Sequence, residues 1–240
     1  YQDAAFAIFG GAPGVVTVDA GAGAVTASGL QFASDGYRVT GASVALTAPR
    51  SIIRVGDGTA AGAAYRATID AALTGAGGLA KADGGTLTLT GANTYAGGTA
   101  LEQGALRVAR DANLGAAAGA LAFNGGALET TADFGSGRAV ALTGAGAIAT
   151  DAGTTLTLTG ALAGAGALTK RGAGTLVLAG DGASFAGATS VAGGTLLVNG
   201  KLGGATGVVA GGTLGGTGTL AGNVNLTGGV LAPGAGGAGT

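Results

Sequence analysis

The feature that most constrains the fold of this chain is a long segment that occurs twice. Residues 73–109 are repeated at 162–199, so that Leu79 aligns with Leu168 at an offset of 89. One inserted residue then raises the offset to 90, and Leu106 aligns with Leu196. Agreement over so many positions exceeds chance. A repeat of this length indicates structural units that stack on one another, because one such unit cannot bury its apolar face alone.

Inside each copy the apolar residues alternate with other residues, as Leu87 and Leu89 do with threonines. A period of two is typical of β-strands, and Gly-rich stretches such as AGGT and VAGG bound each run as turns. No apolar stripe of helical period persists. The residues expected to point inward are Leu87, Leu89, Leu106, Val108, Leu176, Leu178, Leu196 and Val198.

Weaker copies of the same strand lie between and after the two repeats. They are GALAF (119–123), GALET (126–130), GTTLTLTG (153–160), GTLGG (212–216), GTLAGN (218–223) and GVLAPG (229–234). Strands recur about every 15–20 residues, which is the length of one solenoid coil. We therefore expect an all-β chain whose coils stack in parallel, each burying only a few Leu or Val residues.

A disordered low-complexity tract is the alternative, because 58 of the 240 residues are Gly or Pro. Against disorder stand 47% hydrophobic residues and a formal net charge of only -1, whereas disordered chains are usually polar and highly charged. The composition therefore favours a chain that buries a core.

The residue types also exclude several functions. Cys and His are both absent, which removes thiolate and imidazole metal ligands and the Ser-His-Asp and Cys-His mechanisms. The 11 basic residues are scattered singly, so no nucleic-acid partner is expected. No apolar run approaches the roughly 18 residues that a membrane-spanning helix needs. We expect no catalytic, cofactor-binding or metal-binding residue, no small-molecule substrate, and no enzyme activity.

The first copy resembles the passenger-associated transport repeat of bacterial autotransporters. Its residues 77–108, GGLAKADGGTLTLTGANTYAGGTALEQGALRV, follow the usual form G-x-L-x-K-x-G-x-G-T-L-x-L-x-G-x-N-T-Y-x-G-x-T at nearly every position. The second copy keeps GALTKRGAGTLVLAG (166–180) but replaces Asn-Thr-Tyr with GASF. Residues 211–234 are similar to the segment that follows such repeats.

This resemblance implies a right-handed parallel β-helix, forming a single domain over residues 1–240 as a fragment of a longer passenger. It also implies secretion through a C-terminal outer-membrane β-barrel that is absent from this chain, and a location at the bacterial cell surface, outer membrane-associated or secreted. The function implied is a stalk or spacer that supports secretion. Two alternatives remain open: an adhesin or self-association surface, facing the host or another copy, and a scaffold downstream of a subtilisin-like protease or esterase.

Several acidic residues are candidates for a site. Asp57 and Asp181 lie in the Gly-rich sequences VGDG and AGDG, which would suit calcium, but the tandem repeats that such sites need are missing. We favour ordinary Asp-Gly turns. Asp57 with Arg54, or Asp70 with Arg66, could imitate a polysaccharide-lyase site, although solvated charges at turns are the simpler interpretation.

Other residues recur because the repeat recurs. Lys81 and Lys170 occupy one repeat position, which indicates a structural, outward or corner role. Tyr95 and Phe185 also correspond, and we expect them to pack at corners rather than to stack on sugars. The acceptor pattern NLT (225–227) carries little weight.

Overall fold

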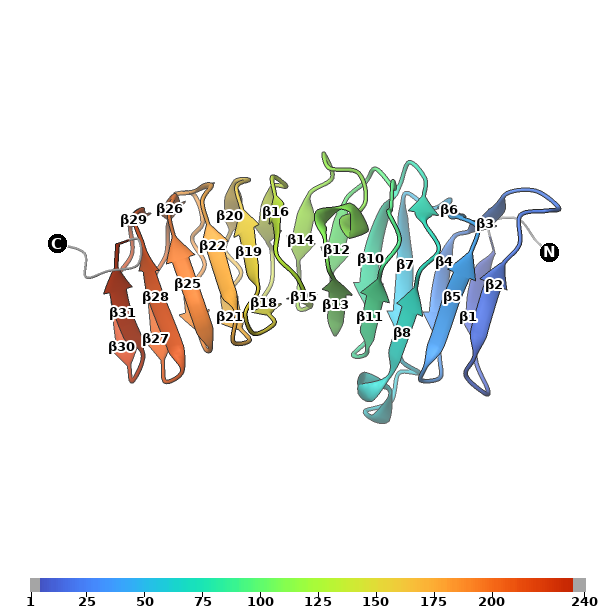
Figure 1. Cartoon of the computed structure of the whole chain (residues 1–240), viewed down its shortest axis with the longest axis horizontal. Helices are drawn as coiled ribbons and strands as arrows, with labels where there is room; N and C mark the ends of the chain where they lie inside the picture. Colours follow the sequence, from blue (N-terminus) through green and yellow to red (C-terminus); the bar gives the residue numbers. More distant parts are fainter. Residues whose placement is uncertain (1–4, 235–240) are drawn as a thin grey trace. The chain divides into compact units, whose positions relative to one another are not determined.

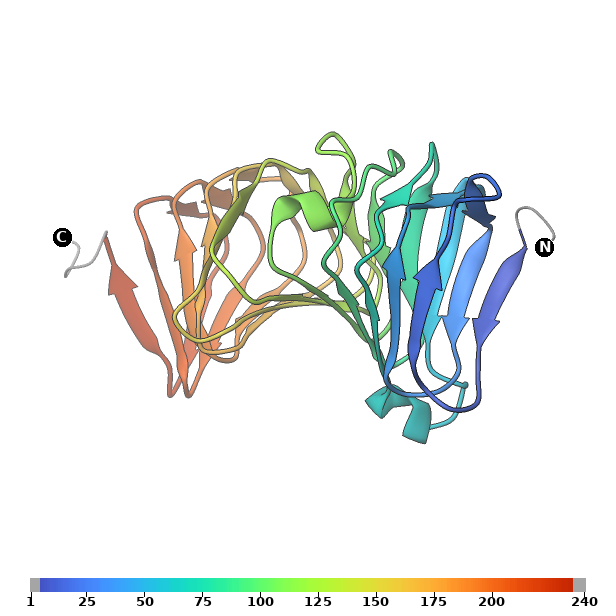
Figure 2. The same ribbon diagram turned by 45° about the vertical axis from the view of Figure 1, so that its right-hand side comes forward.

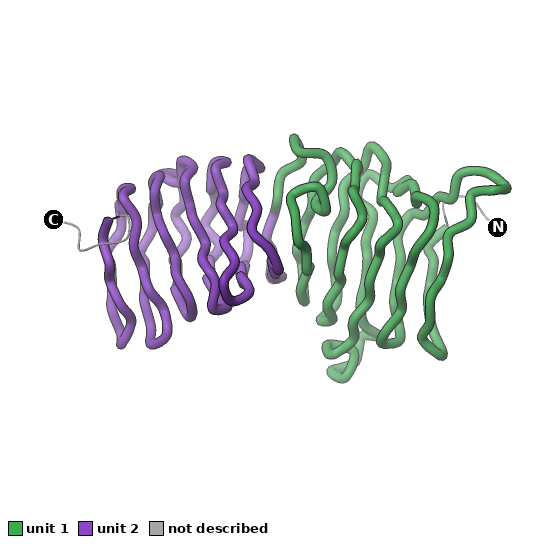
Figure 3. Tube along the Cα trace, viewed as in Figure 1, with its two compact units in different colours: residues 1–121 green, residues 122–240 purple. Residues whose placement is uncertain are grey.

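The computed structural model describes residues 5–234, and the chain divides into two compact units, Tyr1–Leu121 and Ala122–Thr240 (Figure 3). The described residues form strands and two short 3-10 turns, η1 (Ala61–Ala64) and η2 (Asp111–Leu114). Within them no helix is long and apolar enough to cross a membrane. The single domain predicted over 1–240 stays a prediction.

Unit 1 is built from three parallel sheets whose strands follow one another along the chain (Figure 1). The first sheet contains β1 (Phe6–Phe9), β4 (Gly29–Phe32), β7 (Arg50–Val55), β10 (Gly78–Ala82) and β12 (Thr99–Leu101). The second contains β2 (Val15–Val18), β5 (Tyr37–Gly41), β8 (Arg66–Ile69), β11 (Thr86–Leu89) and β13 (Ala105–Val108), and the third contains β3 (Val25–Ala27), β6 (Val44–Leu46) and β9 (Leu73–Thr74). β14 (Leu121–Phe123) lies at the boundary of the units.

Unit 2 repeats the arrangement, and Figure 2 shows its coils from a second direction. One sheet holds β15 (Ala127–Thr130), β18 (Gly146–Thr150), β21 (Leu168–Arg171), β24 (Thr189–Val191), β27 (Thr206–Val209) and β30 (Val224–Thr227). Another, called here the threonine sheet, holds β16 (Phe134–Ser136), β19 (Thr155–Leu158), β22 (Thr175–Leu178), β25 (Gly194–Val198), β28 (Gly212–Gly216) and β31 (Val230–Pro233). The remaining side is formed by β17 (Val140–Leu142) with β20 (Leu162–Gly164), and by β23 (Asp181–Gly182), β26 (Lys201–Leu202) and β29 (Thr219–Leu220). The predicted parallel β-helix is confirmed.

The core of each unit consists of Leu and Val columns that run from coil to coil. In the threonine sheet Leu156, Leu176, Leu196 and Leu214 are successive register partners, and each is at most 1% exposed. All eight residues expected to point inward are buried. Leu176 and Leu196 lie 20 residues apart, within the predicted coil length. Burial in such a column stabilises the fold by about 1.5–3 kcal/mol for each side chain.

Glycine is frequent because the corners of successive coils touch. A Cβ on Gly180 would lie 2.0 Å from the carbonyl oxygen of Gly160, and one on Gly200 would lie 2.1 Å from that of Gly180. Gly218 repeats the contact with Gly200 at 2.1 Å. A real Cβ never approaches backbone so closely, so this corner of unit 2 admits only glycine.

Candidate functional site

The loop around η1 holds Asp57, which the sequence offers as a calcium ligand. Its Oδ1 accepts hydrogen bonds from the backbone N of Thr59 at 2.9 Å and from the hydroxyl of Thr59 at 2.6 Å. Its Oδ2 accepts one from the hydroxyl of Tyr65 at 3.2 Å. The Thr59 hydroxyl is the main cause of a lowered pKa for the Asp57 carboxyl. These are the contacts of a closed turn, since neighbouring donors already occupy both carboxylate oxygens.

The acid and base pairs suggested by the sequence are not the pairs that form. Arg54 donates from Nε to Oδ2 of Asp83 at 3.0 Å, rather than to Asp57. Asp70 forms its ion pair with Arg38 rather than with Arg66. The reason is the register: a residue meets its counterpart on the next coil, and corners of unequal length shift which residue that is. The carboxylates therefore stay dispersed, and the suggested polysaccharide-lyase site is not assembled.

The remaining acidic and glycan candidates lie in ordinary surface positions. Asp181 accepts a hydrogen bond from the backbone N of Ala183 at 3.0 Å, which is a local turn contact. Asn225 of the NLT pattern lies exposed in β30. Across residues 5–234 no three His, Cys, Asp or Glu side chains come together in a group that could hold a metal ion.

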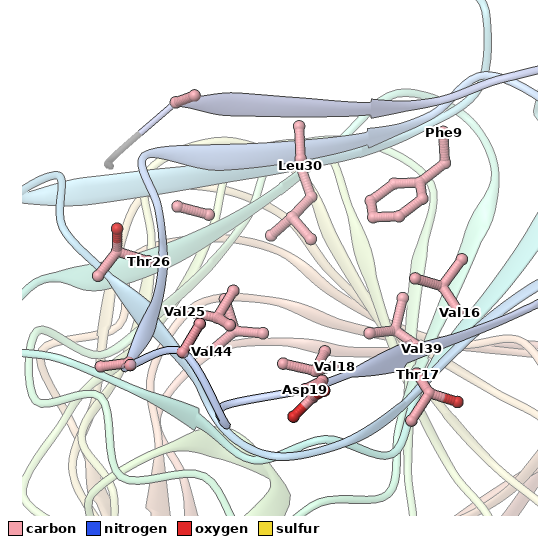
Figure 4. A pocket seen from close by; sticks show the side chains of 16 residues that line it. Phe9, Val16, Thr17, Val18, Asp19, Val25, Thr26, Leu30, Val39 and Val44 are labelled. Atoms are coloured by element: carbon pink, nitrogen blue, oxygen red, sulfur yellow. The ribbon is translucent and has the colours of Figure 1, made fainter. Parts of the chain in front are cut away.

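Unit 1 contains an apolar cavity of about 620 Å³ inside its first coils. Figure 4 shows Phe9 and Leu30 on one side of the cavity, with Val18, Val25 and other valines around it. Asp19 is the one charged residue in its lining. Side chains of this kind offer apolar contact and no acid, base or nucleophile beyond that carboxylate.

The two repeat lysines occupy a position that the sequence leaves undecided. Both are 0% exposed, so an outward role is wrong and a corner role is right. Lys81 donates from Nζ to the carbonyl oxygens of Ala82 (2.8 Å), Asp83 (2.7 Å) and Gln103 (3.2 Å). Burial lowers the pKa of Lys81 to about 8, while the charge of Asp83 raises it in part.

Lys170 repeats this geometry in unit 2. Its Nζ donates to the carbonyl oxygens of Arg171 (2.6 Å), Gly172 (2.9 Å) and Gly193 (3.1 Å). Burial lowers the pKa of Lys170 to about 8 as well. The alternation of the strand could have revealed both lysines, because Leu168 and Lys170 are two residues apart and therefore share the inward face of β21.

The aromatic pair packs inside the corners, as expected. Tyr95 is 0% exposed and Phe185 is 1% exposed. The hydroxyl of Tyr95 lies 2.7 Å from that of Thr99. Side chains buried to this degree cannot stack on a sugar at the surface.

A polar ladder beside Tyr95 escapes the sequence analysis. Asn93 accepts a hydrogen bond from the backbone N of Leu73 at 2.8 Å and donates to the carbonyl oxygen of Asn113 at 2.6 Å. Asn113 in turn donates from Nδ2 to the carbonyl oxygen of Gly91 at 2.8 Å. The two buried asparagines bridge three coils, and the spacing of 20 residues between them is the signal that could have paired them.

Comparison with known proteins agrees with the repeat that the sequence shows. The family described as Passenger-associated-transport-repeat matches residues 79–108 and 168–198, the segments that begin with the strands of Lys81 and Lys170. The chain is also 60% identical, over 89 residues, to a protein named Adhesin BmaC autotransporter from Brucella suis biovar 1 (strain 1330). That alignment covers 37% of this chain and only 3% of the Brucella protein. No solved structure matches. The chain therefore carries two passenger-associated transport repeats, in a segment similar to an autotransporter passenger.

Proposed function

We propose that this chain is a β-helical stalk segment of a bacterial autotransporter passenger, displayed at the cell surface or secreted. The observation that carries the proposal is the parallel register within each unit, where every coil presents the same Leu columns to the next. A fold of this kind gains length by adding coils, about 4.8 Å for each, without needing a new core. The whole protein would then continue into a C-terminal outer-membrane β-barrel.

A substitution experiment tests the stalk role. In a displayed passenger that contains this segment, we would replace it by an unrelated β-solenoid with the same number of coils, and separately by a Gly-Ser linker of equal residue number. Secretion and exposure of an N-terminal epitope should survive the first replacement and decline with the second. The stalk role is wrong if both replacements perform alike, or if the solenoid fails and only this sequence works.

Adhesion or self-association is the second candidate, and one observation favours it. The six strands of the threonine sheet contain no charged residue. The side chains between its inward columns are Thr155, Thr175, Thr195 and Thr213, which are successive register partners, beside Val177 and Leu197. An uncharged face of this kind can approach another surface without desolvating a charge. The Brucella relative, moreover, is called an adhesin.

Glutamate substitutions distinguish this second candidate from a bare stalk. Thr175→Glu with Thr195→Glu places two charges on the outer face of the sheet without touching the core. If the face binds, sedimentation or attachment to immobilised host matrix should show at least a tenfold loss, while epitope display stays unchanged. Unchanged binding removes the face from consideration.

Catalysis is assigned to this segment by neither candidate. The third possibility, a protease or esterase upstream in the parent protein, is decided by the gene sequence on both sides of the segment, where a nucleophile motif would support it. The chain itself should hydrolyse no ester, peptide or glycan above background. A robust activity that one Asp substitution abolishes would contradict this expectation.

A further inference from the structure

We infer that Lys81 and Lys170 are internal cations that fasten each repeat to the coil that follows it. Both lysines replace an aliphatic residue in an inward column. Lys81 has Ile53 and Leu101 as its register partners, and Lys170 has Ile148 and Val191. An aliphatic side chain at this position would satisfy packing alone, so the ammonium has a separate task.

The ammonium groups make the same three contacts in both units. Each Nζ bonds to the carbonyls one and two residues further along its own coil, and to one carbonyl 22 or 23 residues ahead, at the corner of the next coil. Three donors meet three acceptors, which uses the full capacity of a protonated lysine. The carbonyls are therefore arranged as a cage for one primary ammonium ion.

The corners that the cage closes have unusual backbone. The residue two positions after each lysine has positive φ: Asp83 at 62° and Gly172 at 72°. Within the described residues Asp83 is the one non-glycine residue with positive φ, and this costs on the order of 1 kcal/mol for a residue with a Cβ. In the next coil the glycine after the third carbonyl is also left-handed, with φ of 63° at Gly104 and 62° at Gly194. The lysine thus holds two left-handed corners, on successive coils, in one arrangement.

A buried ammonium adds little net stability, because its desolvation offsets much of the gain from hydrogen bonds. The clamp is therefore expected to determine the corner conformation and the coil-to-coil register rather than the total free energy of unfolding. The charged groups nearest to Lys81 are Asp83, whose carboxylate pairs with Arg54, and, for Lys170, the adjacent Arg171. Neither ammonium has a carboxylate among its three partners, so the backbone itself is the ligand.

Chemical rescue tests the cage in the intact 240-residue chain. Lys170→Ala removes the side chain beyond Cβ, and n-propylammonium supplies the missing atoms with three N–H donors. Amide hydrogen exchange around Gly172 and Gly194 should accelerate at least tenfold in the variant and return toward the wild-type rate with n-propylammonium. Tetramethylammonium, a cation without donors, should not restore it. The control Lys201→Ala removes an exposed lysine and should change neither corner.

Two results would overturn the inference. One is unchanged exchange at both corners in Lys170→Ala, and the other is equal rescue by tetramethylammonium. Should the alanine variant fail to fold, the wild-type chain still decides the question through ¹⁵N spectra of its lysine side chains. Two ammonium groups, assigned to Lys81 and Lys170, should show slow proton exchange at pH 6 and scalar coupling to backbone carbonyls. Fast exchange for both groups would also overturn the inference.

Discussion

At the scale of single residues, glycine and lysine fill the two positions of this fold that tolerate least change. A glycine is required where a corner carbonyl of the preceding coil lies within about 2 Å of the place that a Cβ would take, as at Gly180. A lysine is required where three corner carbonyls converge inside the core, as at Lys170. Both requirements come from the neighbouring coil and not from the strand that contains the residue.

Gly180→Ala is expected to destabilise the chain by about 2–4 kcal/mol, because the new methyl group would overlap the Gly160 carbonyl and force the two coils apart. Gly137→Ala is the matched control in the same unit. Its Cβ would meet nothing closer than the Thr159 hydroxyl, at 3.7 Å. Urea denaturation of both variants measures the difference. Equal losses would show that the corner relaxes without cost.

The buried lysines predict an unusual pH dependence of stability. Burial lowers the pKa of each folded lysine from 10.5 to about 8, so between these values the unfolded chain binds more protons. The free energy of unfolding should therefore rise with pH from about 8 to 10.5, by on the order of 1–3 kcal/mol for each lysine, and lack this slope below about pH 8.

Denaturation of the wild-type chain and of Lys81→Met with Lys170→Met at several pH values checks this linkage. The double variant should lose the rise, while the tyrosines and arginines contribute equally to both proteins. A constant difference in stability between the two proteins from pH 7 to 10.5 would mean that the lysines keep their ordinary pKa.

At the scale of the elements, strands were predictable and corners were not. The period of two in TLTL and TLVL sets which residues of β11, β19 and β22 face inward, because alternation is a local property of an extended chain. Corner contacts depend on which residue of the next coil comes alongside. The loop around η1 lengthens one coil so that Val39 and Ile69, 30 residues apart, are register partners. The sequence alone therefore suggested Arg54 with Asp57, whereas the structure pairs Arg54 with Asp83.

The asparagine ladder belongs to this scale, because it joins the corners of three coils in unit 1. Asn93→Ala should cost about 2–4 kcal/mol, since it leaves the buried backbone N of Leu73 and the carbonyl of Asn113 without their partner. Asn199→Ala is the control, because Asn199 is exposed and only accepts a hydrogen bond from the backbone N of Thr217. Thermal unfolding of the two variants measures both costs. A loss below 1 kcal/mol for Asn93→Ala would show that water replaces the ladder.

At the scale of the whole molecule, each unit is a stack in which any coil meets its neighbours through the same columns. Deletion of residues 177–196 removes one register period of the threonine sheet and joins Leu176 directly to Leu197. Since Leu197 is the register partner of Val177, the shortened chain should keep its strands in phase and remain folded. Deletion of residues 177–195 removes one residue fewer and should turn every later Leu and Val outward until the chain slips. Circular dichroism and sedimentation distinguish a folded monomer from an aggregate. Equal behaviour of the two deletions would contradict the proposed stacking.

The glycine corners of unit 2 carry a consequence for how such a gene can change over time. Gly160, Gly180, Gly200 and Gly218 make one contact repeatedly, so the geometry that joins two coils does not depend on which two coils they are. Unequal recombination between similar stretches of DNA adds or removes whole periods, and an interchangeable joint makes the products foldable. A lineage can therefore adjust the reach of such a protein in steps of one coil, without first evolving a new interior.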